Sequence, residues 1–112
     1  MDLITELSAT DRVTLEEGQL GVVEFYLPTC KACNNFAPTY EQVAQENQDT
    51  KFYKMNVTSS DGKSPSQMWN IKAVPTTAIF TERISPGNEL ARMLGNKPPE
   101  IVQALLEKYK PS

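Results

Sequence analysis

The two cysteines of the chain lie three residues apart, as Cys30-Lys31-Ala32-Cys33, and this pair is the strongest constraint on the fold. A largely apolar run, residues 22–27, precedes the pair, and a segment with helical spacing of apolar residues follows it. The dithiol is therefore expected at a strand-to-helix junction, where unpaired backbone N–H groups and the helix dipole stabilise a thiolate on the first cysteine. The spacing also lets the two sulfurs close a small disulfide ring. We interpret the pair as a redox-active dithiol.

Length, charge and composition argue against several other classes of protein. A chain of 112 residues is expected to form one domain, residues 1–112, and 39% hydrophobic residues suffice for an ordinary core. The net charge of −3, without a cluster of lysine or arginine, argues against nucleic-acid binding. No apolar run is long enough to cross a membrane, and the N-terminus lacks the features of a secretory signal. We therefore expect a cytoplasmic protein, in which a catalytic disulfide is more common than a structural one.

A metal site is the first alternative for the cysteines. A structural zinc ion usually takes four ligands from cysteine and histidine, and the chain has no histidine and no third cysteine. We therefore expect no metal and no cofactor beyond the redox-active disulfide Cys30–Cys33. A metal shared between two chains and an inert cysteine pair are the alternatives that the local sequence leaves open.

The distribution of apolar residues and turn signals predicts alternating strands and helices. Strands are expected over residues 3–7, 20–27, 52–57, 74–81 and 89–94, the last of these an antiparallel edge strand that follows the turn at residues 85–88. Helices are expected from Ser8 or Thr10 to near Gly18, from the cysteines to about Gln48, over residues 66–70 with Trp69 buried, and from residues 96–99 onward. Residues 58–65 are expected to form a loop.

Two of the predicted helices have a clear apolar face. In the helix after the cysteines, the residues on one stripe are Phe36, Tyr40, Val43, Ala44 and Asn47, and all but Asn47 are expected in the core. In the last helix, the apolar face comprises Ile101, Val102, Leu105, Leu106 and Tyr109. The resulting order is βαβαβαββα, an α/β fold with parallel crossovers first and a hairpin at the end.

Glu24 interrupts the strand that leads to the dithiol. A carboxylate buried in such a strand needs a partner or must take up a proton, and an unpaired buried charge is costly. We expect Glu24 to be paired and functional. The alternative is that Glu24 reaches a sheet edge and is solvated.

The order of elements and the motifs along it resemble the thioredoxin family over nearly the whole chain. The segments that match the family pattern in position are Phe25-Tyr26, Thr29-Cys30-Lys31-Ala32-Cys33, Phe36-Ala37-Pro38, Ile71-Lys72-Ala73-Val74-Pro75-Thr76 and Gly95. This resemblance implies the thioredoxin fold, with a central mixed five-stranded sheet flanked by helices. It also implies a thiol–disulfide oxidoreductase that reduces disulfides of protein substrates.

The resemblance further implies a role for each site residue. Cys30 would attack the substrate disulfide and Cys33 would resolve the mixed disulfide. Glu24 stands where the family places a buried aspartate, and Lys54 where it places the lysine near that acid. The residues expected to contact substrate are Thr29, Lys31, Ala32, Val74 and Pro75, with a cis Val74–Pro75 bond and an added substrate strand. The implied partners are disulfide-containing proteins and a thioredoxin-reductase-like electron donor, and the chain is expected to act as a monomer.

The departures from the family pattern keep alternative functions open. Lys31 and Ala32 replace Gly-Pro between the cysteines, which adds a positive charge and changes the rigidity of the turn. Thr29 replaces a tryptophan that shelters the dithiol and contacts partners. The alternatives are an oxidase or isomerase role on the same fold, and a non-catalytic binding or metal-holding module.

Overall fold

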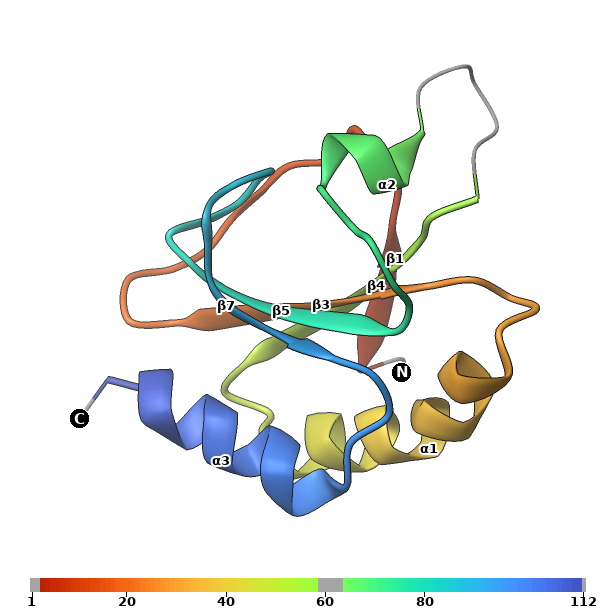
Figure 1. Cartoon of the computed structure of the whole chain (residues 1–112). Coiled ribbons are helices and arrows are strands. Elements are labelled where there is room, and N and C mark those ends of the chain that lie inside the picture. Colours follow the sequence, from red (N-terminus) through yellow and green to blue (C-terminus); the bar gives the residue numbers. More distant parts are fainter. Residues whose placement is uncertain (1–2, 59–63, 112) are drawn as a thin grey trace.

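A mixed five-stranded sheet forms the centre of the computed structural model, which describes residues 3–58 and 64–111 (Figure 1). The strand order is β1-β4-β3-β5-β7. The parallel part consists of β1 (Ile4–Leu7), β4 (Lys51–Asn56) and β3 (Leu20–Tyr26). β5 (Thr76–Thr81) runs antiparallel to β3, and β7 (Glu89–Leu94) runs antiparallel to β5. The central sheet predicted from the sequence is confirmed.

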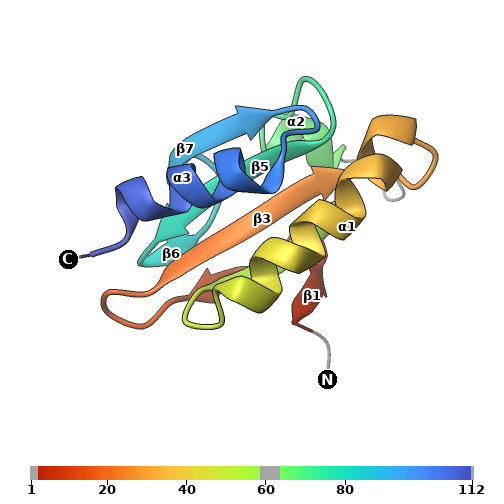
Figure 2. The same cartoon turned by 90° about the horizontal axis from the view of Figure 1, so that it is seen from below.

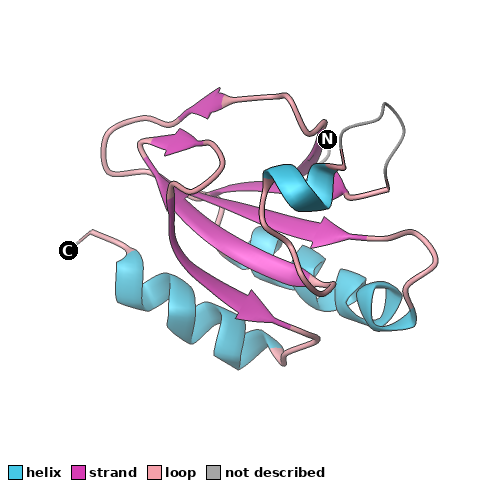
Figure 3. Ribbon diagram, turned by 45° about the horizontal axis from the view of Figure 1, so that its top comes forward, coloured by secondary structure: helices cyan, strands magenta, loops and turns pink. Residues whose placement is uncertain are grey.

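Helices cover both faces of this sheet. α1 (Lys31–Glu46) and α3 (Pro99–Tyr109) lie side by side on one face, as Figure 2 shows from below. α2 (Pro65–Met68) lies on the other face, together with a two-stranded ribbon of β2 (Val13–Thr14) and β6 (Arg83–Ile84) (Figure 3). In the part of the chain described, no helix is long and apolar enough to cross a membrane.

β3 supplies side chains to both hydrophobic cores. Val22 packs with Phe36 and Tyr40 of α1, whereas Phe25 packs on the opposite face with Trp69. Because successive side chains of a strand point to opposite faces, a strand covered on both sides must be apolar almost throughout. Residues 20–25 are all buried, which agrees with a central strand. The same alternation directs Glu24 and Tyr26 toward the α1 face.

The helix predicted before Gly18 is wrong. Residues 8–11 form a turn, in which the backbone N–H of Ser8 donates to Asp11 Oδ2 at 2.8 Å, and β2 follows. β2 pairs with β6, and the N–H of Leu15 donates to the Glu82 carbonyl at 2.8 Å. These partners come from a segment nearly seventy residues away along the chain. A pairing over that distance is absent from the local pattern, so tertiary context decided the conformation.

Smaller predictions have mixed outcomes. Trp69 is buried, as expected, with 2% of its surface exposed. Ile101 is 48% exposed and does not belong to the core-facing stripe of α3. Asn47 is buried although it is polar, because its side-chain amide donates to the carbonyl of Val43 at 2.8 Å and to Gln103 Oε1 at 2.6 Å. The predicted loop over 58–65 lies for the most part outside the described residues.

Candidate active site

Cys30 caps the N-terminus of α1. Its backbone is extended, and its Sγ atom accepts a hydrogen bond from the backbone N–H of Cys33 at 3.1 Å. The Cys30 thiol also faces the Val74 carbonyl at 3.9 Å. The Cys30 sulfur thus takes the place of a capping side-chain acceptor at the start of α1. Cys30 is half-buried, whereas the second cysteine of the pair is buried.

Cys33 lies one turn further into α1 and is buried, with 3% of its surface exposed. Burial raises the pKa of its thiol from 9.0 to about 11, with further increases from its contact with Cys30 and from the charges of Cys30 and Glu24. A backbone hydrogen bond from Leu27 acts in the opposite direction. Both cysteines are in the free thiol form. The pair therefore combines a half-buried cysteine with a buried cysteine whose thiol must lose a proton before it can react.

Glu24 lies in the middle of the sheet on the face that α1 covers, and only 5% of its surface is exposed. The alternative of a solvated edge carboxylate is therefore wrong. Burial raises its pKa from 4.5 to about 7, with a small further rise from Glu6, while the charge of Lys54 acts to lower it. A group that titrates near neutral pH can both accept and release a proton.

Lys54 is the direct neighbour of Glu24 in β4, because the two Cα positions pair across the parallel strands. Its ammonium group lies 5.8 Å from the centre of the Tyr26 ring. The ion pairs found within residues 3–58 and 64–111 do not include Lys54. Lys54 thus acts on the Glu24 carboxyl through its field rather than through a contact ion pair.

A third polar side chain on this face, Glu6 in β1, was not identified from the sequence. Glu6 pairs with Lys54 across β1 and β4, and its carboxylate accepts a hydrogen bond from the Tyr26 hydroxyl at 2.8 Å. This contact contributes to raising the pKa of Tyr26 to about 12, after burial as the main cause. Residues 3–7 have no regular alternation of polar and apolar side chains, and no local pattern indicates which strand lies beside Glu6.

The residues expected to contact substrate surround the dithiol. Thr29, Lys31 and Ala32 are exposed, Val74 is half-buried, and Pro75 is buried. The Val74–Pro75 peptide bond is cis. The N–H of Gly95 donates to the Pro75 carbonyl at 2.8 Å, which brings the end of β7 beside this bond.

Leu94 precedes Gly95 and pairs with Thr76 across β5 and β7, and 56% of its surface is exposed. Its sequence pattern predicted only an edge strand. Because large exposed apolar side chains are typical of binding surfaces, Leu94, whose partner Thr76 follows the cis Val74–Pro75 bond, is an additional candidate contact for substrate.

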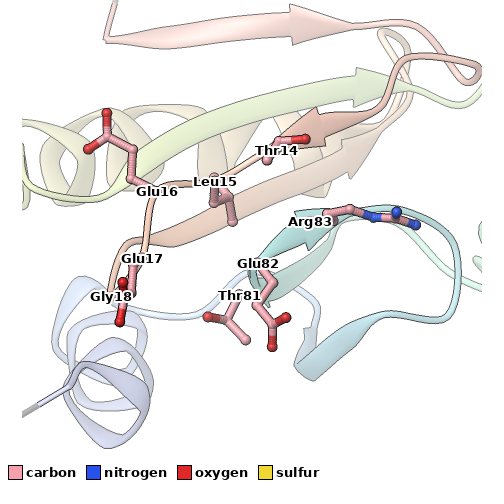
Figure 4. Close-up of a pocket in the computed structure, with 8 residues that line it drawn as sticks. All are labelled: Thr14, Leu15, Glu16, Glu17, Gly18, Thr81, Glu82 and Arg83. Atoms are coloured by element: carbon pink, nitrogen blue, oxygen red, sulfur yellow. The ribbon is translucent and has the colours of Figure 1, made fainter.

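A metal centre and a separate pocket are the other kinds of site to compare with the dithiol. Residues 3–58 and 64–111 contain no group of three or more histidine, cysteine, aspartate or glutamate side chains arranged to hold a metal. A pocket of about 540 Å³ is lined by Leu15, Glu17 and Glu82, among others (Figure 4). This pocket lies where β3 begins, whereas the dithiol follows the end of β3 (Figure 1). It therefore takes no part in the chemistry of the cysteines.

Comparison with known proteins agrees with this site. The thioredoxin family model matches residues 4–108. A thioredoxin of Mycoplasmoides gallisepticum is 31% identical over 102 residues, which cover 84% of this chain and 99% of that protein. Thioredoxin-2 of Saccharomyces cerevisiae is 27% identical over 106 residues, covering 92% of this chain and 96% of that protein. The X-ray structure of Fasciola hepatica thioredoxin has a TM-score of 0.67 at 27% identity and covers 83% of each chain. The chain belongs to the thioredoxin family of thiol–disulfide oxidoreductases.

Proposed function

We propose that the chain reduces disulfides of protein substrates by thiol–disulfide exchange at Cys30 and Cys33. The observation that carries this proposal is the asymmetry of the two sulfurs. Cys30 is half-buried and its Sγ accepts the N–H of Cys33 at 3.1 Å, whereas Cys33 is buried, with only 3% of its surface exposed. An accessible thiolate at a helix start is a nucleophile, and a covered thiol one turn away serves as the resolving group.

In the first step, the Cys30 thiolate attacks one sulfur of a substrate disulfide. A bond forms between Cys30 and that sulfur, and the other substrate sulfur leaves as a thiolate. Val74 and Pro75 would hold the substrate chain as an added strand, because the half-buried Val74 carbonyl lies beside Cys30. Thr29, Lys31 and Ala32 would contact the substrate from the helix side, where all three are exposed.

In the second step, Cys33 attacks Cys30. The Cys33–Cys30 bond forms, the bond from Cys30 to the substrate breaks, and the substrate leaves as a thiolate. Because the pKa of Cys33 is raised to about 11, its thiol needs a base to release its proton near neutral pH. Glu24 would accept that proton, since its own pKa lies at about 7 and its charge reaches Cys33. The proton transfer would pass through water, and Lys54 would stabilise the charged form of Glu24.

The proposal also covers partners and location. Completion of a catalytic cycle requires a donor that reduces the Cys30–Cys33 disulfide, and a thioredoxin-reductase-like protein is the expected donor. The cytoplasm is the expected location, because it is a reducing compartment in which thiol–disulfide exchange leads to reduction of substrate disulfides. A dithiol potential near about −270 mV would agree with a reductant, and one near about −120 mV would indicate an oxidant instead.

Trapping experiments with single cysteine variants test the proposal. Cys33→Ser should form a stable covalent adduct with a disulfide-containing protein such as insulin, because nothing resolves the mixed disulfide. Cys30→Ser serves as the matched control and should form no such adduct and reduce no insulin. Insulin reduction by Cys30→Ser at the wild-type rate would refute the assigned roles.

A further inference from the structure

Thr77 carries a buried hydroxyl group that the described chain leaves without a hydrogen-bond partner. Only 1% of Thr77 is exposed, and its Oγ1 atom pairs with no other group of residues 3–58 and 64–111. Buried hydroxyl groups are almost always hydrogen-bonded, because burial removes the bonds that they make with water. The neighbouring Thr76 obeys this rule, since its hydroxyl donates to the Ala73 carbonyl at 2.7 Å. The unpaired hydroxyl of Thr77 therefore calls for an explanation.

The register of the sheet places Thr77 directly beside Glu24. The two residues are paired across β3 and β5, which are antiparallel. Directly opposed residues point their side chains to the same face, with Cβ atoms about 4.5–5.5 Å apart. Ile79, two residues after Thr77, packs in the same core as α1, which places Thr77 on the α1 face with Glu24. A rotation of either side chain, or one bridging water, would join the hydroxyl to the carboxyl group.

A hydroxyl group suits this position because it can both donate and accept a hydrogen bond. It donates to an ionised carboxylate, and it accepts from the same carboxyl group once that group holds a proton. A methyl group in the same place does neither. The Thr77 hydroxyl can therefore stay hydrogen-bonded to the Glu24 carboxyl group both before and after that group takes up a proton.

We propose that Thr77 is a positioning residue for proton transfer from Cys33, whose hydroxyl holds the Glu24 carboxyl group in place directly or through one water. This inference rests on the proposed function of Glu24 as the proton acceptor. The Cys33 thiol gives its proton to the Glu24 carboxylate while the Cys33 sulfur bonds to Cys30 and the substrate thiolate departs. Thr77 itself gains and loses no proton overall.

Other groups also act on the Glu24 carboxyl and are common to all variants compared below. The titratable side chains on the elements packed around Glu24 are Glu6 of β1, Lys54 of β4, Tyr26 of β3, and Cys33 and Tyr40 of α1. A substitution at Thr77 leaves all of these groups in place. A change in the titration midpoint of the Glu24 carboxyl group is therefore attributed to loss of the Thr77 hydroxyl.

The direct test is the titration of the Glu24 side-chain carboxyl by carbon-13 NMR in wild type and Thr77→Val. Valine keeps the shape and β-branching of threonine and removes only the hydroxyl. Loss of a hydrogen bond to the charged form should raise the Glu24 midpoint by about one pH unit. Thr77→Ser should restore the wild-type midpoint, and Thr77→Ala provides a second hydroxyl deletion if the valine variant folds poorly.

Thr76→Val is the matched control, because it deletes a buried hydroxyl one residue away on the opposite face of the sheet. Its Glu24 midpoint should equal that of wild type. An unchanged Glu24 midpoint in Thr77→Val and Thr77→Ala would overturn the inference. A raised melting temperature in these variants would then show that the Thr77 hydroxyl has no hydrogen-bond partner and only destabilises the folded protein.

Single-turnover kinetics separate this inference from the function on which it rests. Thr77→Val should slow the resolution step near neutral pH and move its pH profile upward, and it should have no further effect in a Glu24→Gln background. A wild-type resolution rate in Glu24→Gln alone would refute the role of Glu24 in the proposed function. An effect of Glu24→Gln without any effect of Thr77→Val would refute only the inference about Thr77.

Discussion

Replacement of Glu24 by glutamine should stabilise the protein above neutral pH while it impairs the chemistry. Burial raises the pKa of Glu24 from its ordinary 4.5 to about 7, and the side chain is only 5% exposed. The two values differ by about 2.5 pH units, which corresponds to about 3 kcal/mol of folding free energy. This is the cost of keeping a charged carboxylate in the sheet, and glutamine avoids it because it is neutral at every pH.

The sign of the pH dependence follows from proton binding. Between about pH 4.5 and 7, the folded state holds a proton on Glu24 that the unfolded state has released. The contribution of Glu24 to stability is therefore fully present below about pH 4.5 and is lost as pH rises through about 7. At low pH the protonated acid and the glutamine amide are similar, and the two proteins should be equally stable.

The assay is urea unfolding of the reduced wild type and of Glu24→Gln at several pH values from about 4 to 8. The difference in unfolding free energy should grow from near zero to about 3 kcal/mol in favour of the variant over this range. The other titrating groups are common to both proteins and cancel in this difference. Equal pH dependence of the two unfolding free energies would refute the conclusion that Glu24 is buried with a pKa near 7.

Two further predictions concern the cores on the two faces of the sheet. Trp69 packs against Phe25 on the face of the sheet opposite α1 and donates its indole N–H to the Ala9 carbonyl at 3.0 Å, so its fluorescence should change little between the oxidised and reduced states. A large redox-dependent change in emission intensity would contradict this placement. Tyr40→Phe should destabilise the protein by about 1–2 kcal/mol in urea unfolding, because the buried hydroxyl donates to the Tyr53 carbonyl at 2.6 Å. Tyr109→Phe is the matched control at a half-buried position and should change stability by less than about 0.5 kcal/mol, and a loss equal to that of Tyr40→Phe would refute the argument.

Patterns that act over a few residues were predicted correctly. The apolar run that became β3, the apolar stripe of α1 and the turn before β7 depend on neighbours close in sequence. The burial of Glu24 was expected from its apolar strand, but only the central position of β3 in the sheet excluded the alternative of a solvated edge. The failed helix before Gly18 shows the limit, since Val13 and Thr14 adopt strand geometry only because Arg83 and Ile84 lie beside them.

The sequence by itself determined that a reactive cysteine pair would stand at the start of a helix, because capping and helix-dipole effects act within one turn. It also determined that a carboxyl group would lie in the strand that leads to that pair. Only the tertiary structure decided which groups surround this carboxyl. Glu6, Lys54, Glu24 and Thr77 come from four separate strands and are aligned across the sheet by strand register. Register depends on how whole strands pack, and a shift of any one of these strands by one residue would move its side chain to the opposite face.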